Sequence, residues 1–516
     1  MTSRKSSLRL WPAIVILVAG LAGQAWAWLR DEPTRQMRVM DSLFYGVVTL
    51  FLLLLWLFFF SRLAGRLRLR IFGALFALGA LFFTLVEIRG VSGDLVPRLG
   101  WRWASQLAPA PEGSGSYSAV PGEEGGFPQF LGPQRDARLR DVRLRRDWPA
   151  APPREVWRRP VGAGWSSFAV IGNLAITQEQ RGEQEAVVAY DLSSGEPVWS
   201  HSDEARYATT VGGVGPRATP TIASGRVFTV GSTGILNALD LASGRELWSV
   251  DLVAEHGAEI PDWGKSSSPL VDGPRVIVPV RAGGRSLIAF AAESGEVLWQ
   301  EGSGGVSYSS PRLASLDGRE QVLIFNSDGV AGHDPETGTV LWTYPWSRDQ
   351  PNVAQPVVLG ADRVLISSGY GIGSSLLRVS ETESSGLVAQ EVWTSRRLKL
   401  KFAQAVEFEG SLYGLDDGVL TSIDPATGER RWKRGRYGHG QILLVGDLLL
   451  VQTEAGRLIL VEPDPSELKE LASIEALSGH AWNTMAFSPP YLLLRNHQEA
   501  VCYELALAEE RSQETS

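Results

Sequence analysis

Three long apolar runs occupy the first hundred residues of the chain. They are Pro12–Leu29, Ser42–Phe60 and Ile71–Ile88, and each is close to the ~20 residues that cross a ~30 Å hydrocarbon core. The third run has a single charged residue, Glu87, near its end. The pattern predicts three transmembrane helices with these bounds, within a membrane region that covers residues 1–98.

Basic residues next to these runs predict their orientation. Three precede the first run, and four arginines lie between residues 62 and 70 with no acidic residue among them. Lys and Arg clusters stay cytoplasmic, so the chain after the third helix is expected on the periplasmic side of the cell inner membrane, in a multi-pass protein. Ala25-Trp26-Ala27 also fits a signal-peptide cleavage site, and cleavage there would leave the same side for the C-terminal part.

Residues 99–126 are predicted to be a linker, because they are rich in Pro, Gly and Ser and lack apolar periodicity. Residues 127–508 follow as the globular part, and residues 509–516 are predicted to be a disordered tail. The globular part has an internal repeat, for example Asp191-Leu-Ser-Ser-Gly-Glu-Pro-Val-Trp199 and Asp240-Leu-Ala-Ser-Gly-Arg-Glu-Leu-Trp248. Three more clear copies and a looser one, Glu383–Trp393, follow.

In each copy an alternating or apolar strand leads into a turn. The Asp carboxylate can accept a backbone N–H bond, and the Gly can take positive φ. A second strand then ends in Trp, which we expect to fill the wedge between neighbouring blades. These docking tryptophans recur every 39 to 51 residues, at the spacing of a four-stranded propeller blade. They are Trp157, Trp199, Trp248, Trp299, Trp342, Trp393 and Trp432.

Counting the strand pairs before each turn gives eight units. The eighth ends near Leu505 without a good fourth strand, whereas Arg154-Glu-Val-Trp157 has no blade of its own. The N-terminal strand is therefore predicted to complete the last blade and remove free sheet edges. The predicted fold class is an all-β, eight-bladed propeller preceded by three transmembrane helices.

Charge and cysteine content narrow the function. Residues 1–100 carry 12 Lys and Arg against 5 Asp and Glu, and the remaining residues carry 37 against 52. The acidic C-terminal part would repel phosphates, so nucleic acid is not an expected partner.

The single cysteine, Cys502, excludes an internal disulfide and a multi-thiolate zinc site, and is expected as a buried thiol in the last blade. The six histidines show no metal-ligand spacing, and His333 and His497 are expected at the surface.

The Asp-x-x-Ser/Thr-Gly-x-x-x-Trp motif resembles the tryptophan-docking repeat of pyrroloquinoline-quinone (PQQ)-type propellers. The resemblance covers about residues 127–505, and the segment Phe127–Asp136 looks like the opening segment of many bacterial members. This family includes quinoprotein dehydrogenases and the BamB-type scaffold of outer-membrane β-barrel assembly, and the fold does not select between them. The dehydrogenases hold PQQ against a disulfide of adjacent cysteines and beside Ca²⁺, and this chain lacks the cysteine pair.

Polar and aromatic residues recur where the innermost strand of each unit begins, so the ring should bring them together at one mouth of the channel. There they either meet water as a solvated rim or form a ligand or partner site, in which basic groups attract an anion and aromatic rings stack. The candidates are Trp165, Ser166, Arg217, Lys265, Ser266, Tyr308, Gln355, Lys401, Gln404, His439, Gln441, Trp482 and Asn483.

No catalytic residue, metal site or cofactor is predicted. The sequence favours a membrane-anchored exoplasmic propeller that binds an envelope protein or small ligand as a scaffold. The alternative is a PQQ-dependent quinoprotein oxidoreductase with Ca²⁺. A third hypothesis is a sensor of an envelope ligand, against which the short cytoplasmic segments argue.

Overall fold

The computed structural model describes residues 9–30, 34–103 and 126–508, except residues 211, 306–307, 348–349 and 384–385. Most of the predicted linker and the whole predicted tail, residues 509–516, lie outside the described residues. The chain divides into two compact units, Met1–Ser105 and Gln106–Ser516.

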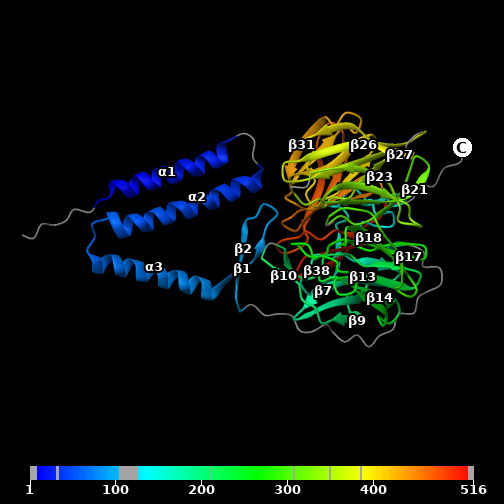
Figure 1. Cartoon of the computed structure of the whole chain (residues 1–516), viewed down its shortest axis with the longest axis horizontal. Helices are drawn as coiled ribbons and strands as arrows, with labels where there is room; N and C mark the ends of the chain where they lie inside the picture. The colour runs from blue at the N-terminus through cyan, green and yellow to red at the C-terminus, as the bar shows by residue number, and fades with distance from the viewer. Residues whose placement is uncertain are drawn as a thin grey trace, which may run out of the picture. The chain divides into compact units, whose positions relative to one another are not determined.

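The first unit consists of three helices and a hairpin (Figure 1). The helices are α1 (Trp11–Leu29), α2 (Arg35–Leu55), which continues as a π-helical turn (Trp56–Phe60), and α3 (Gly65–Leu85). All three are long and apolar enough to cross a membrane. The hairpin pairs β1 (Val86–Val91) with β2 (Pro97–Trp101). The apolar run predicted as a helix to Ile88 therefore ends in a strand, since apolar residues alone do not distinguish the two.

Glycines let α1 and α2 pack closely, side by side (Figure 1). A Cβ atom at Gly23 would lie 2.7 Å from Cδ1 of Tyr45, so a larger residue there would require the Tyr45 ring to shift. Gly20 faces Thr49 in the same way. Small residues at the contact let the backbones of two membrane helices approach closely.

The second unit contains, among its described residues, eight sheets of four or five strands. We number these eight sheets 1 to 8 in the order of their strands along the chain. Sheet 1 consists of β3 (Gly126–Phe127), β6 (Ala169–Ile171), β7 (Leu174–Arg181), β8 (Gln184–Asp191) and β9 (Pro197–Asp203). Sheet 2 consists of β12 (Thr221–Ala223), β13 (Arg226–Val230), β14 (Ile235–Asp240) and β15 (Glu246–Asp251). Sheet 3 consists of β16 (Leu270–Asp272), β17 (Arg275–Ala282), β18 (Arg285–Ala291) and β19 (Val297–Glu301). Sheet 4 consists of β20 (Arg312–Leu316), β21 (Arg319–Asn326), β22 (Gly329–His333) and β23 (Val340–Pro345).

The remaining sheets follow the same order. Sheet 5 consists of β24 (Val357–Leu359), β25 (Arg363–Ser368), β26 (Gly373–Thr382) and β27 (Gly386–Ser395). Sheet 6 consists of β28 (Ala405–Phe408), β29 (Ser411–Asp416), β30 (Val419–Ile423) and β31 (Arg430–Arg436). Sheet 7 consists of β32 (Gln441–Val445), β33 (Leu448–Gln452), β34 (Arg457–Glu462) and β35 (Lys469–Glu475), with β4 (Arg138–Leu139) beside β32. Sheet 8 consists of β36 (Ala486–Ser488), β37 (Tyr491–Arg495), β38 (Glu499–Glu504) and β5 (Arg154–Pro160). A short pair, β10 (Ala208–Thr209) and β11 (Gly213–Val214), lies outside these sheets.

The sheets are arranged as in a propeller. Inner strands of successive sheets contact one another, as β6, β12, β16 and β20 do, and β36 of the last sheet contacts β6 of the first. The buried core therefore lies between neighbouring sheets. One cluster joins residues of sheets 6, 7, 8 and 1, including Leu443, Phe487 and Val170.

The repeated turns form as predicted. In sheet 1, Oδ1 of Asp191 accepts bonds from the backbone N–H groups of Ser193 (3.1 Å) and Ser194 (2.8 Å), and Gly195 takes φ +74°. This geometry starts and closes a tight turn between β8 and β9.

The docking tryptophans bridge neighbouring sheets at six seams. For example, the indole N–H of Trp199 donates to the carbonyl of Leu241 in the next sheet (3.0 Å), and that of Trp248 donates to Ala292 (3.1 Å). The same bond is made by Trp157, Trp299, Trp393 and Trp432. Trp342 also packs in the wedge, in one buried cluster with Val364 and Leu377 of sheet 5, but its indole N–H donates to Gln321 of its own sheet.

The N-terminal strand completes the last sheet, as predicted. β5 pairs antiparallel with β38, and Trp157 lies opposite Cys502. Cys502 is fully buried there, and burial raises the pKa of its thiol to about 12. Sheet 8 therefore has no turn between its third and fourth strands. A tryptophan in sheet 7 would therefore have no such turn to dock on. At the position where the other sheets have a docking tryptophan, sheet 7 has Ala472, opposite Leu460.

One expectation about the surface is wrong. His333 lies in β22 with no exposed surface, because its ring faces the interior of the sheet and Nδ1 contacts the carbonyl of Gly338 at 2.9 Å. Burial lowers the pKa of this imidazole. His497, between β37 and β38, is half-buried.

Candidate functional site

The predicted channel-mouth residues lie at the starts of the inner strands, and several of them join neighbouring sheets. Nδ2 of Asn483 in sheet 8 donates to the carbonyl of Ser166 in sheet 1 (2.7 Å). Nε2 of Gln441 donates to the carbonyl of Trp482 (2.9 Å), and Gln404 accepts a bond from the backbone N–H of Gln355 (3.2 Å). These amides are buried and hold the inner strands together.

Serine and threonine hydroxyls extend this pattern through the first four sheets. The backbone N–H of Ser167 donates to Thr219 Oγ1 (3.2 Å), that of Thr219 to Ser268 Oγ (2.9 Å), and that of Ser268 to Ser310 Oγ (2.9 Å). Each hydroxyl oxygen accepts a bond from a backbone N–H group of the preceding sheet, so each of these buried N–H groups has a partner. Ser266 similarly donates to the carbonyl of Tyr308 (3.1 Å).

The opening segment, residues 126–139, pairs with the inner strands of two sheets. Phe127 pairs with Val170 at the end of β6, and Arg138 pairs in parallel with Leu444 near the end of β32. Between them, the carbonyl of Pro128 accepts a bond from Ile222 of sheet 2 (2.8 Å).

Arg135 anchors the middle of this segment. Its buried guanidinium donates to the carbonyls of Pro311 (2.7 Å) and Ser268 (3.3 Å) and to Oγ1 of Thr221 (3.1 Å), which belong to three successive sheets or the segments leading into them. Burial and the nearby Arg312 lower the pKa of Arg135 to about 9. The segment thus contacts sheets 1, 2 and 7 and, through Arg135, the residues that lead into sheets 3 and 4.

One side of this rim is aromatic. The ring of Trp482 lies 4.8 Å from that of Trp165 and 5.1 Å from that of Phe402, measured between centroids. His480 lies 4.5 Å from Trp482, and His439 lies 5.4 Å from Phe402. These rings come from the starts of sheets 1, 6, 7 and 8. Sequence reasoning missed Phe402 and His480, although both stand next to predicted rim positions.

Glu454 ties this aromatic group together. Its Oε1 accepts a bond from Nε1 of Trp482 (3.0 Å) and lies 3.3 Å from Nε2 of His480, and its Oε2 accepts from the backbone N–H of His439 (3.0 Å). The carboxylate is therefore occupied with positioning its neighbours.

Two of the three predicted cations are held by backbone or aromatic groups. Arg217 donates to Ser232 Oγ (3.2 Å) and to carbonyls of its own loop, and it lies 4.6 Å from the Tyr207 ring centroid. Nζ of Lys401 lies 4.5 Å from the centroid of Tyr370. Burial lowers the pKa of Arg217 to about 10.

Lys265 has the most perturbed ammonium of the rim. Its side chain is buried, and the polar contact of its Nζ is the carbonyl of Pro279 at 3.5 Å. Burial lowers the pKa of Lys265 to about 8, so its charge is lost as the pH rises through this value. The nearby Tyr308 is half-buried and packs edge-on against Trp263, with 5.7 Å between the ring centroids.

The donor set of the rim does not fit a Ca²⁺-assisted quinone site. Across the described residues, no three His, Cys, Asp or Glu side chains lie close enough to hold a metal ion. The rim offers aromatic faces and cations, and these suit an anionic or aromatic group without a metal.

Comparison with known proteins agrees with this architecture. Residues 182–434 match the family described as outer membrane protein assembly factor BamB. The crystal structure of BamB from Moraxella catarrhalis superposes with a TM-score of 0.51 at 18% identity, over 68% of this chain and 97% of that chain. Quinohemoprotein alcohol dehydrogenase from Comamonas testosteroni superposes with a TM-score of 0.52 at 13% identity, over 76% and 82%. Comparison with curated proteins gave no match.

Identities this low establish the fold alone. The chain carries a BamB-like β-propeller domain of PQQ-type repeats, preceded by three long apolar helices.

Proposed function

We propose that this protein is a membrane-anchored interaction scaffold of the bacterial cell envelope, with an eight-bladed propeller on the periplasmic side. The observation that carries the proposal is that the polar groups of the rim have structural roles. Its amides, hydroxyls and Glu454 join sheets or position rings, and they form no nucleophile–base pair. The match of the repeats to the BamB family supports a binding role.

The eight sheets support the blade count, because each has an inner strand beside that of its neighbour or a bond to it. The last link of the ring joins Asn483 to Ser166. We interpret β5 as the strand that closes the ring, since it is the fourth strand of sheet 8.

The periplasmic side is supported by the four arginines between residues 62 and 70, which precede or begin α3. An alkaline phosphatase fusion after Val120 should be active, and one after Arg66 should be silent. The reverse pattern would place the propeller in the cytoplasm and contradict the proposal.

The partner is best sought in native membranes. Photo-crosslinkers placed at Trp165 and Phe402 on the rim should capture a specific envelope protein or ligand, whereas one at Arg245, on a turn of sheet 2, should not. Equal capture at both places would contradict a binding role for the rim.

The PQQ-dependent oxidoreductase is the second candidate, and the buried Lys265 beside the rim is the observation in its favour, because its ammonium could attract a carboxylate. The scaffold proposal predicts no PQQ-dependent dye reduction with alcohols or sugars when Ca²⁺ is present. Turnover that Lys265→Ala or Lys401→Ala abolishes would establish the oxidoreductase instead.

A further inference from the structure

A strongly basic region stands out on an otherwise acidic domain. Residues 396–436 hold nine Lys and Arg against six Asp and Glu, whereas residues 101–516 as a whole hold 37 against 52. Three of the chain's six lysines lie in this stretch. We define the basic cluster as Arg396, Arg397, Lys399, Arg430, Lys433 and Arg434.

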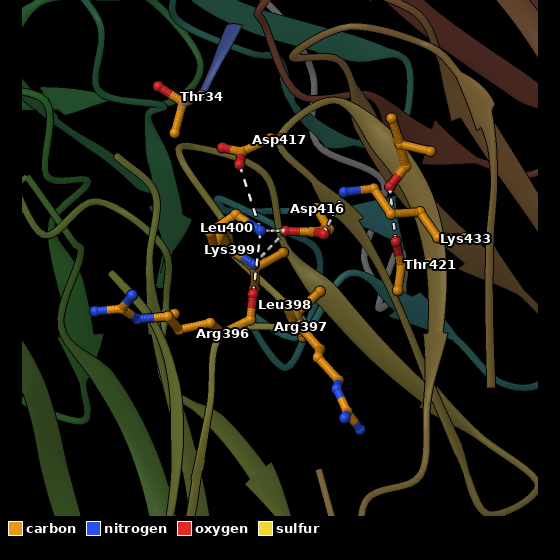
Figure 2. A network of polar contacts seen from close by, with 12 residues as sticks. Thr34, Arg396, Arg397, Leu398, Lys399, Leu400, Asp416, Asp417, Thr421 and Lys433 are labelled. Carbon is orange, nitrogen blue, oxygen red and sulfur yellow. Dashed lines mark hydrogen bonds and ion pairs between the residues drawn. The ribbon is translucent and has the colours of Figure 1, made fainter. Parts of the chain in front are cut away.

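A single buried carboxylate organises the centre of the cluster. Asp416, at the end of β29, has no exposed side-chain surface, and the ammonium groups of Lys399 and Lys433 both bind it. Nη2 of Arg430 lies 3.5 Å from the same carboxylate, and the backbone N–H of Lys399 donates to it at 3.0 Å. Figure 2 shows this network, with Asp417 3.4 Å from Nζ of Lys399.

Positive charge exceeds negative charge at this point. Three cations share Asp416, and Asp417 adds one further carboxylate. Burial lowers the pKa of Lys433, and the charges of Lys399 and Arg430 lower it further, while Asp416 acts in the opposite direction. An additional anion near these cations would relieve their mutual repulsion.

Other cations of the cluster face outward. Arg396 and Arg434 are exposed, and within the described part of the chain neither forms an ion pair. Figure 2 shows the side chains of Arg396 and Arg397 pointing away from Asp416. Arg397 is paired with the exposed Glu429.

Protection of a sheet edge does not explain the whole cluster. Charges on β31, the outermost strand of sheet 6, would discourage edge-to-edge pairing. However, Arg396, Arg397 and Lys399 lie on the connection between sheets 5 and 6, where there is no strand edge to protect.

We propose that the basic cluster docks an acidic, extended segment of a partner protein. The outer edge of β31 offers backbone groups to an added strand, and the surrounding cations match carboxylates along it. The exposed Arg396 and Arg434 bind carboxylates of the partner directly, while Asp416 holds Lys399 and Lys433 in place. This inference rests on the proposed scaffold function and adds the chemistry of the partner.

The test uses the full chain in detergent and a fluorescein-labelled 20-residue polyglutamate, with fluorescence anisotropy as the readout. Binding should weaken at least tenfold in the double variant R396E/R434E and should weaken steeply with added salt. R396K/R434K should retain most of the affinity. R245E is the matched control, because Arg245 is an exposed arginine on a turn of sheet 2, and it should bind as the unaltered chain does.

Three results would overturn the proposal. The first is equal affinity of the unaltered chain and R396E/R434E when both have the same circular dichroism spectrum. The second is binding to phosphatidylglycerol vesicles, lost in R396E/R434E, without binding to polyglutamate, which would make a lipid surface the occupant. The third is an envelope protein captured equally by the unaltered chain and R396E/R434E, which would leave the scaffold function standing and remove this site from it.

Discussion

Two seams between neighbouring sheets show what the tryptophan-docking motif requires. At the seam between sheets 2 and 3, Trp248 lies over Gly295 of the next turn and donates to the carbonyl of Ala292. At the seam between sheets 4 and 5, Trp342 is just as buried but binds Gln321 of its own sheet. A buried tryptophan is therefore not sufficient for a hydrogen bond between neighbouring sheets.

The receiving turn makes the difference. In sheet 5 the third and fourth strands, β26 and β27, are ten residues each, and the sequence between them has Glu383 in place of the Asp of the repeated turn motif. Their hairpin contacts the preceding sheet along β23 instead, where the hydroxyl of Tyr344 donates to Glu391 (2.6 Å). Trp342 still packs against Val364 and Leu377 of sheet 5, so this seam keeps its apolar contact and loses the directional bond.

The largest effect is expected at the seam that closes the ring. A propeller domain that begins at Gly162 lacks the opening segment with Arg135 and the strand β5, and it leaves β38 as an open edge. It should aggregate or melt far below a domain that begins at Phe127. Equal melting temperatures by circular dichroism would show that closure does not stabilise the fold.

Removal of a docked ring should have the next largest effect. Trp248→Ala should cost roughly 3–5 kcal/mol in the free energy of unfolding, because it leaves a cavity between sheets 2 and 3. Denaturant unfolding of the Phe127–516 domain measures this cost. A cost below about 1 kcal/mol would mean that the seam collapses around the loss.

The receiving glycine can be tested separately. Gly295→Ala should cost roughly 2–3 kcal/mol, because φ is +76° and the new Cβ would lie 2.9 Å from Cδ2 of Trp248. The matched control is Gly273→Ala, at φ +52° with no atom within 4 Å of the new Cβ, and it should cost only about 1 kcal/mol. In the Trp248→Ala background the two substitutions should cost the same. If the difference persists there, contact with the ring is not its cause.

The smallest effect is expected at the seam between sheets 4 and 5. Gln321→Leu should cost about 1–2 kcal/mol, because it leaves the buried indole N–H of Trp342 without an acceptor. The same substitution in a Trp342→Phe background should be nearly neutral. An equal cost in both backgrounds would assign the effect to packing at Gln321.

The sequence predicted the fold well because the repeat is a local pattern. Each turn motif specifies its own hairpin, and the surplus strand at Arg154–Trp157 had a single vacant position to fill. The bond from Trp342 to its own sheet could not be predicted, because the sequence marks the tryptophan clearly but does not show what lies opposite it. The looser copy Glu383–Trp393 was the available warning.

The rim was predicted less completely. Its position followed from the repeat, but a Gln or Asn at an inner-strand start has the same pattern whether it faces solvent or bonds to the next sheet, as Gln441 and Asn483 do. The basic cluster was missed because its charges come from separate segments that only Asp416 joins. The scarcity of lysine elsewhere was the signal that could have found it.

The pairing of β5 with β38 also constrains how the protein is made. Glu155 and Tyr503 are partners across the closing seam, although nearly the whole length of the domain separates them along the chain. A chain that emerges N-terminus first must therefore keep β5 without its partner until the C-terminal strand has been synthesised. Such long-range closure is slow, and the unfinished ring presents an unpaired strand to proteases and chaperones throughout that interval.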